Sequence, residues 1–267
     1  MRPSRIKAKW SRGEAALVTT LHLTDPSLYE LTSLMGFDGI WLDLEHHGTS
    51  EETAAQLMRA ARVGGADIIA RPAKGEMMRM GRLLEMGAQG IMYPRCSSAD
   101  EAAEVVRWSK FAPLGQRGFD GGNPDGLYCS FPLAEYVAWA NSQTFIVIQL
   151  EDPQAIDAAA AIAAVPGVDA LMLGPADFSI LSGIPGAWDH PSIKQASERI
   201  AAAAAAAGKQ WGRPVSSAEE AQTLLKMGAR IVFHHADILM VRQGLEKIRR
   251  DFAPLGFTFD DRIANRS

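Results

Sequence analysis

Residues able to carry acid–base or metal chemistry follow several short apolar runs of this sequence. They are four carboxylates, a histidine, an arginine and a glutamine. In chain order the set is Asp43, Glu45, His46, Arg71, Gln149, Glu151 and Asp177. If the apolar runs are neighbouring parallel strands, their carboxyl ends meet at one rim. The set therefore predicts a single polar site.

Glu151 and Asp177 follow successive apolar runs, so their carboxylates are expected to lie close together. Two close carboxylates repel each other unless one is protonated or a cation lies between them. A hard divalent cation that keeps several waters suits so small a ligand set. The alternative is that each carboxylate caps a following helix. In GPADFS, Pro175 suits a first helical position and leaves the amides of Ala176 and Asp177 free for a carboxylate or phosphate, unless the segment is an ordinary turn.

Arg71 ends an apolar run and precedes a proline. An arginine buried there needs an anionic partner, either a substrate oxygen that gains negative charge or a neighbouring carboxylate. His46 follows Asp43 by three residues. A histidine oriented by a carboxylate is a good general base near neutral pH. The adjacent His47 leaves open which histidine is poised, and a solvent-exposed, inert loop histidine is the alternative.

The elements that must position these residues alternate between short apolar runs and amphipathic segments. Runs such as DGIWLD, TFIVIQL and DALMLG are typical of parallel strands buried on both faces. The expected strands are Ala16–Leu21, Gly39–Asp43, Asp67–Arg71, Gly90–Pro94, Thr144–Leu150, Asp169–Gly174, Lys209–Arg213 and Arg230–His234. The expected helices include Glu51–Arg62, Met77–Met86, Ala99–Lys110, Ala218–Met227 and Ile238–Phe252.

The spacing of the strands predicts an α/β fold of the (β/α)8 TIM-barrel type in a single domain, residues 1–267. Most successive strand ends are roughly 20–30 residues apart, which is one strand–helix unit. Two longer gaps hold two helices each: Ala99–Lys110 with Pro132–Asn141, and a short helix after Gly174 with Ile193–Ala207. Residues 1–14 are expected to form an N-terminal extension and residues 253–267 a C-terminal tail. A doubly wound open sheet is the alternative, but no GxGxxG follows the first strand.

Composition narrows the class of protein. The chain has 267 residues, 47% of them hydrophobic and 22% charged, with a net charge of −4. No basic tract indicates nucleic-acid binding. Cys96 and Cys129 are too few for a disulfide framework, and the charged N-terminus leads into no apolar signal segment. No apolar stretch is long enough for a membrane span. We therefore expect a cytoplasmic protein with a small-molecule substrate.

Six motifs in order resemble one family, the HpcH/HpaI aldolases. They are GFDGIWLDLEHH, ARP, GAQGIMYPR, PLGQRG, QLED and GPADFS. These enzymes are metal-dependent class II pyruvate aldolases related to 2,4-dihydroxyhept-2-ene-1,7-dioate aldolase. The resemblance implies a barrel that reversibly cleaves a 4-hydroxy-2-oxo acid into pyruvate and an aldehyde through a metal-stabilised enolate. It implies Glu151 and Asp177 as ligands of Mg²⁺, Mn²⁺ or Co²⁺. It also implies a homo-oligomer, commonly a hexamer with exchanged terminal helices.

The resemblance also assigns roles to single residues. Arg71 would contact the keto oxygen of pyruvate. His46 would be the acid/base residue, with Asp43 orienting it. Gln149 would lie beside the substrate, and the turn formed by Gly174, Ala176 and Asp177 would hold the pyruvate carboxylate. The loop with Gly115, Arg117 and Gly118 would close over the rim. No Schiff-base lysine is required.

The chain departs from the family pattern after the last two strands. Arg213 in WGRPVSS, and His234 and His235 in VFHHAD, stand where small residues are more usual. They predict recognition of an acidic or polyhydroxylated aldehyde; alternatively, Arg213 pairs with a carboxylate and the histidines fill a turn. Two other functions stay open: another enolate carbon–carbon lyase or condensing enzyme acting on oxaloacetate- or citrate-related substrates, and a non-catalytic barrel that binds a metal or an oxo acid.

Overall fold

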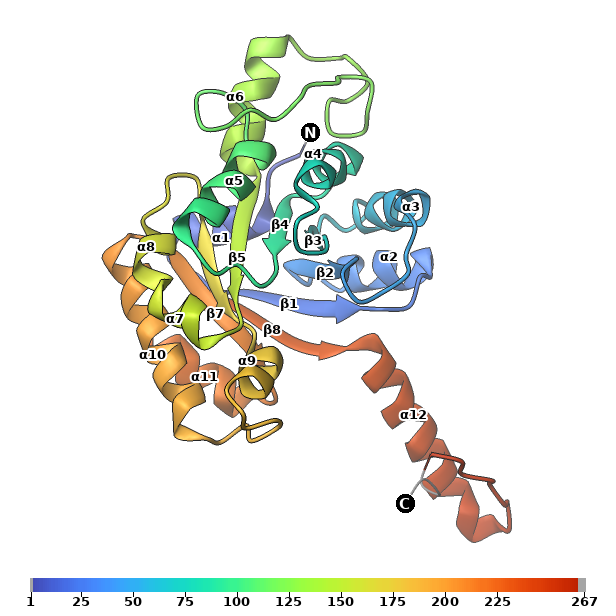
Figure 1. Ribbon diagram of the computed structural model, residues 1–267. Helices are drawn as coiled ribbons and strands as arrows, with labels where there is room; N and C mark the ends of the chain where they lie inside the picture. Colours follow the sequence, from blue (N-terminus) through green and yellow to red (C-terminus); the bar gives the residue numbers. More distant parts are fainter. Residues whose placement is uncertain (1, 264–267) are drawn as a thin grey trace.

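Eight parallel strands close into a barrel in the computed structural model, which describes residues 2–263 (Figure 1). Each strand pairs with its neighbours in chain order, and β1 pairs with β8. The strands are β1 (Ala16–Leu21), β2 (Gly39–Asp43), β3 (Asp67–Arg71), β4 (Gly90–Tyr93), β5 (Phe145–Leu150), β6 (Ala170–Leu173), β7 (Gln210–Val215) and β8 (Ile231–Ala236). The predicted TIM barrel is confirmed.

Helices alternate with the strands along the chain. They are α1 (Arg5–Ser11), α2 (Pro26–Leu34), α3 (Glu51–Ala61), α4 (Met77–Met86), α5 (Ala99–Ser109), α6 (Leu133–Gln143), α7 (Pro153–Asp157), α8 (Ala159–Ala163), α9 (Pro175–Leu181), α10 (Pro191–Ala206), α11 (Ala218–Lys226), α12 (Asp237–Phe252) and the short 3₁₀ helix η1 (Ala253–Leu255). None of the helices in residues 2–263 has the length and apolar run needed to span a bilayer.

Alternation along each strand builds two apolar layers. Side chains such as Val18, Trp41 and Met172 point into the barrel and pack on one another. The intervening side chains, such as Leu42 and Leu171, pack outward under the helices. Strands buried on both faces read as continuous apolar runs, which is why their sequences marked them so clearly. The buried charged side chains Asp43 and Arg71, which interrupt this pattern, lie at the carboxyl ends of β2 and β3.

Serine caps begin three of the helices that follow strands. Ser50, Ser98 and Ser217 each accept a hydrogen bond from the backbone amide three residues later, and two acidic residues occupy the first turn of each helix. Capping by serine and acidic side chains near a helix N-terminus both stabilise the helix. In α11 this arrangement fixes Glu220 beside the end of β7.

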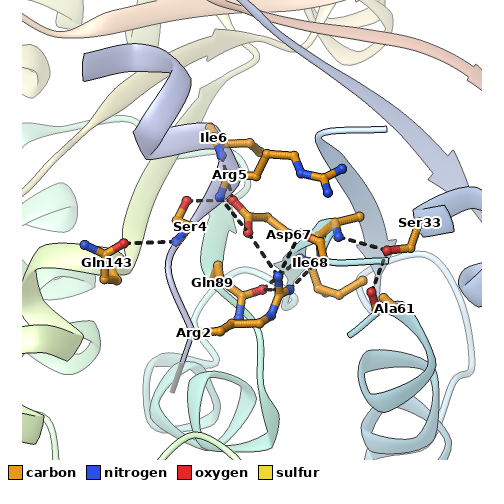
Figure 2. A network of polar contacts seen from close by, with 12 residues as sticks. Arg2, Ser4, Arg5, Ile6, Ser33, Ala61, Asp67, Ile68, Gln89 and Gln143 are labelled. Atoms are coloured by element: carbon orange, nitrogen blue, oxygen red, sulfur yellow. Dashed lines mark hydrogen bonds and ion pairs between the residues drawn. The ribbon is translucent and has the colours of Figure 1, made fainter. Parts of the chain in front are cut away.

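The N-terminal segment closes the barrel at the end opposite the carboxyl ends of the strands. The fully buried Asp67, at the start of β3, accepts hydrogen bonds from the Ser4 hydroxyl at 2.6 Å and from the amides of Arg5 and Ile6 (Figure 2). Arg2 lies 3.6 Å from the same carboxylate. Burial raises the pKa of Asp67, and these donors oppose the rise. The predicted N-terminal extension is thus packed against the barrel and closes this end of it; residue 1 lies outside the described residues.

The last long helix leaves the barrel. Asp237, at its first position, is buried and accepts the backbone amides of His22 and Leu23, which ties the helix start to the end of β1. From there α12 projects away from the barrel, and the following segment turns back along it (Figure 1). Exposed apolar side chains line α12: Ile238, Leu239, Met240, Val241, Leu245, Ile248 and Phe252. Within the predicted tail 253–267, residues 264–267 lie outside the described residues.

Candidate active site

A cavity of about 820 Å³ opens at the carboxyl ends of the strands. Its lining includes most of the residues that the sequence singled out: His46, Arg71, Gln149, Glu151, Gly174, Ala176, Asp177 and Arg213. Pockets of several hundred cubic ångströms hold small-molecule ligands in many enzymes. Pyruvate fills only a small part of such a volume, so the cavity has room for a second reactant.

Asp43, which does not line the cavity, pairs with Arg71, which does. The two residues are direct neighbours in the register of β2 and β3. Arg71 donates from Nε to Asp43 Oδ1 at 2.9 Å and from Nη2 to Oδ2 at 2.7 Å. Burial by itself would raise the pKa of Asp43, but the hydrogen bonds and charge of Arg71 bring it below its ordinary value. This bidentate pair fixes the plane of the guanidinium.

The free side of the Arg71 guanidinium faces the site. Its Nη1 lies 3.4 Å from Gln149 Oε1, and its Cζ lies 4.5 Å from the centre of the Trp41 ring. Arg71 Nε also lies 3.2 Å from Glu45 Oε2. Both alternatives predicted for Arg71 are therefore compatible: it forms a structural ion pair and still lines the cavity.

Glu151 is the most perturbed carboxyl group of the cavity. It is 2% exposed and accepts the Gln149 side-chain amide at 2.7 Å on Oε1 and the Arg95 backbone amide at 2.7 Å on Oε2. Burial raises the pKa of Glu151 to about 7; the Arg95 amide opposes the rise and the charge of Asp177 adds to it. Such a group readily exchanges its proton for a cation near neutral pH.

The backbone of Gly174 makes room for the Glu151 carboxylate. A Cβ atom at position 174 would stand 2.4 Å from Glu151 Oε1. Asp177 follows in the first turn of α9, where Pro175 occupies the start of the helix as the sequence predicted. Because Gly174 offers no capping side chain, the amides of Ala176 and Asp177 have no partner within the helix.

The two carboxylates fit a divalent cation with few protein ligands. Among residues 2–263, no three His, Cys, Asp or Glu side chains come together as a metal site. Neither Glu151 nor Asp177 forms an ion pair within that part of the chain. Oxygen ligands in a small set, completed by substrate and water, suit Mg²⁺ and similar hard cations.

The predicted pairing of Asp43 with the His46 ring is wrong. Asp43 accepts the backbone amide of His46 at 3.5 Å, but its carboxylate is occupied by Arg71 and lies 3.7 Å from His47 Nε2. The His46 ring lies in the cavity wall with Nε2 3.7 Å from Glu45 Oε2. His47 instead stacks on His22, with ring centres 4.3 Å apart. The turn after β2 separates the two rings, and the carboxylate beside His46 belongs to Glu45.

Arg213 lines the cavity and also forms an ion pair. Its Nη2 lies 2.6 Å from Glu220 Oε1, and its Nη1 donates to the Pro214 carbonyl oxygen at 3.1 Å. His234 and His235 do not line the cavity: His234 lies 2.9 Å from the Val215 carbonyl oxygen and His235 lies 3.1 Å from Gln243 Oε1. Of the three departures from the family pattern, Arg213 alone reaches the site described in residues 2–263.

The loop with Gly115, Arg117 and Gly118 does not close over the rim in this chain. Arg117 is buried, with its guanidinium 3.7 Å from Asp125 and 3.4 Å from the Tyr136 hydroxyl. The reason is topological. Helix α5 runs antiparallel to the strands, so the segment after it begins at the opposite end of the barrel from the cavity.

No lysine lines the cavity within the described part of the chain. Lys110 is buried, and burial lowers its pKa to about 8, which would suit a Schiff-base lysine. Its Nζ, however, donates to the Thr144 carbonyl oxygen at 2.6 Å and to the Asn141 carbonyl oxygen at 3.2 Å. Both acceptors precede β5, at the closed end of the barrel. Lys110 is therefore a structural residue.

Sequence reasoning missed three parts of the site. The Arg95 amide binds Glu151 because Arg95 adopts a left-handed conformation, with φ of 52°, directly after β4. A backbone donor leaves no signature in residue type, so nothing in the sequence marked it. Trp188 and Asp189, in the loop before α10, and Glu220 also line the cavity. The serine cap and acidic first turn of α11 were the available signal for Glu220.

The sequence of the family described as HpcH/HpaI aldolase/citrate lyase matches residues 18–242 of this chain. The chain belongs to this family. A hydroxypyruvate/pyruvate aldolase of Pseudomonas aeruginosa is 32% identical over 252 residues, covering 93% of this chain and 92% of the relative. A 4-hydroxy-2-oxovalerate aldolase of Novosphingobium aromaticivorans is 32% identical over 239 residues, covering 89% and 90%.

Comparison with solved structures supports the same family. The crystal structure of an HpcH/HpaI aldolase from Desulfitobacterium hafniense superimposes with a TM-score of 0.87 at 29% identity, covering 92% of this chain and 95% of that one. The matched region of the family contains strands β2 to β8, all of β1 except its first two residues, and all the cavity residues described above. An enzyme of the aldolase family is therefore established, and the family is typically dependent on a divalent metal.

Proposed function

We propose that this protein is a class II pyruvate aldolase that reversibly cleaves a 4-hydroxy-2-oxo acid into pyruvate and an aldehyde. The observation that carries the proposal is the joint presence of Glu151, Asp177 and Arg71 in the wall of one cavity, with Gly174 leaving the space that Glu151 needs. Relatives named hydroxypyruvate/pyruvate aldolase and 4-hydroxy-2-oxovalerate aldolase support pyruvate as the substrate that forms the enolate.

Glu151 and Asp177 would hold the cation, which we propose to be Mg²⁺, Mn²⁺ or Co²⁺. When bound, the cation supplies positive charge that stabilises the enolate of pyruvate. The chain orients the first ligand from two sides, because Gln149 and the Arg95 amide each hold one oxygen of Glu151. Support of this kind keeps a ligand in place and strengthens metal binding.

Arg71 would bind the oxygen that gains negative charge when pyruvate becomes an enolate. Its guanidinium is locked by Asp43 and leaves Nη1 directed toward Gln149 and the cavity. A donor held in advance needs no reorganisation during the reaction. The amides of Ala176 and Asp177 would bind the pyruvate carboxylate at the start of α9.

His46 would move the proton on the aldol oxygen. In cleavage its ring takes the proton of the C4 hydroxyl, and the bond between C3 and C4 breaks. In condensation the ring returns that proton as the bond forms. Glu45, whose Oε2 lies 3.7 Å from His46 Nε2, would stabilise the imidazolium that forms in cleavage. This role replaces the one predicted for Asp43.

The test is exchange of the pyruvate methyl protons for deuterium, followed by NMR in D₂O. It needs no knowledge of the aldehyde. We expect exchange with added Mg²⁺ or Mn²⁺ and none with a chelator. The Glu151→Gln variant should show no metal-dependent exchange while keeping its fold. Absence of exchange with every metal would refute the proposal.

We also propose that copies of this chain assemble through α12. The apolar side chains of α12 named above stay exposed although the segment after α12 turns back along it, and α2 exposes Leu31, Leu34 and Met35 (Figure 1). An apolar surface of this extent is typical of an interface. Exchange of α12 between copies would cover both surfaces and give the homo-oligomer that the resemblance implies.

A further inference from the structure

One side of the cavity is built from residues that the proposed chemistry does not use. We name it the β7 wall; it consists of Trp188, Asp189, Ile193, Arg213, Ser216 and Glu220. These residues come from the loop before α10, the start of α10, the end of β7 and the first turn of α11. The residues proposed to hold pyruvate come from the ends of β3, β5 and β6. The β7 wall is therefore the surface left for the aldehyde.

Arg213 is the only cation of the β7 wall in the described chain, and the neighbouring carboxylate of Glu220 balances its charge. Glu220 Oε1 lies 2.6 Å from Arg213 Nη2. Glu220 Oε2 accepts the Ser216 amide at 2.7 Å and the Ser216 hydroxyl at 2.8 Å. Burial would raise the pKa of Glu220, but these donors and Arg213 hold it below its ordinary value. The carboxylate is thus ionised at neutral pH.

Asp189, in the exposed loop before α10, adds a second carboxylate to the β7 wall. Two carboxylates against one guanidinium leave the wall with an excess of negative charge, so a second anionic group on the aldehyde would be repelled. Hydroxyl groups can both donate to carboxylates and accept from a guanidinium, whereas a carboxylate can only accept. Arg213 keeps a buried Nε without a partner, and Trp188 and Ile193 offer apolar surface.

From this balance of charge and hydrogen-bonding groups, we infer that the acceptor is a neutral hydroxyaldehyde rather than an aldehyde that carries a carboxylate. The inference rests on the proposed aldolase function and selects between the acidic and the polyhydroxylated acceptors that the sequence left open. Arg213 acts here as a donor to hydroxyl oxygen, with its net charge offset by Glu220.

The test compares two aldehydes that differ in one terminal group. Glyceraldehyde ends in a hydroxymethyl group, and tartronate semialdehyde ends in a carboxylate. With pyruvate and Mn²⁺, we expect kcat/KM for glyceraldehyde to exceed that for freshly prepared tartronate semialdehyde at least about tenfold. Glu220→Gln leaves the Arg213 charge without its counterion, so this preference should fall by about tenfold, which corresponds to ~1.4 kcal/mol. Asp189→Asn, on an exposed loop, should shift the ratio in the same direction.

Glu219→Gln is the matched control. It makes the same change of charge one residue away, at an exposed position that does not line the cavity, and should leave the ratio unaltered. A wild-type preference for tartronate semialdehyde, or a ratio that neither Glu220→Gln nor Asp189→Asn changes, would overturn the inference while methyl exchange of pyruvate still upheld the aldolase function. Absence of that exchange with every metal would overturn both.

Discussion

Ionisation of the buried Glu151 lowers the free energy of unfolding of the metal-free protein, and the Glu151→Gln variant tests this directly. The pKa of Glu151 lies at about 7 in the folded chain, against an ordinary value of 4.5. A raised carboxyl pKa means that folding favours the protonated form. The protonated carboxyl group therefore contributes to stability fully below pH 4.5, and this contribution is lost as the pH rises through about 7.

The size of the effect follows from these two values. At about 1.4 kcal/mol for each tenfold change in an ionisation constant, ionised Glu151 lowers the free energy of unfolding by about 3 kcal/mol at pH 8 and by less than about 1 kcal/mol at pH 5. Glutamine carries no charge at either pH. It also gives up one of the two hydrogen bonds that Glu151 accepts, at a cost of about 1 kcal/mol that hardly depends on pH.

We therefore expect the stability of Glu151→Gln relative to wild type to improve by about 2.5 kcal/mol between pH 5 and pH 8. The assay is urea unfolding in EDTA, at one protein concentration because the chain is expected to associate. Glu135→Gln, at an exposed position on α6, controls for the loss of a charge. Mn²⁺ should then stabilise wild type and leave the variant unchanged. A stability difference that is the same at both pH values would refute the reasoning.

Three further changes test separate parts of the site and the assembly. Gly174→Ala puts a Cβ 2.4 Å from Glu151 Oε1, so Mn²⁺ affinity measured by calorimetry should fall by about 10–100-fold; an unaltered affinity would count against Glu151 as a ligand. His46→Ala should slow aldol cleavage by about 100-fold with little change in Mn²⁺ affinity, and an equal loss of both would make His46 a ligand. Leu245→Asp combined with Ile248→Asp should yield monomers in light scattering with an unchanged circular dichroism spectrum, whereas an unchanged mass would exclude the apolar face of α12 as the interface.

The barrel could be predicted from the sequence because a short apolar run followed by an amphipathic segment recurs along the chain. The strands β1, β2 and β3 and the helix α4 have the predicted bounds, and the other elements with predicted bounds differ by one or two residues at one or both ends. Strands β7 and β8 each extend two residues beyond their expected ends at Arg213 and His234. Strand β7 continues to Val215, which pairs with His234 of β8. A proline removes one donor but leaves its carbonyl group free to pair.

The site was harder to predict because residue types do not fix directions. A carboxylate three residues before a histidine suggests a pair, yet the turn after β2 directs Asp43 toward Arg71 and leaves Glu45 beside His46. The loop around Arg117 carries a recognisable motif, but only the antiparallel course of α5 shows that the loop begins at the far end of the barrel. The Arg95 amide has no side-chain signature at all. Each of these features depends on backbone geometry between the elements.

The charges of the site divide into pairs that the chain itself balances and one pair that it does not. Asp43 balances Arg71, and Glu220 balances Arg213. Glu151 and Asp177 form no ion pair within residues 2–263; the charge of Asp177 helps to raise the pKa of Glu151, and the charge of Arg71 only partly opposes the rise. Two neighbouring like charges, one of them buried and the other half-buried, are costly unless the charge of a cation from outside the chain compensates them. A divalent cation supplies that charge at the same place where pyruvate must become an enolate, which is why we assign the metal to this pair and the aldehyde to the balanced β7 wall.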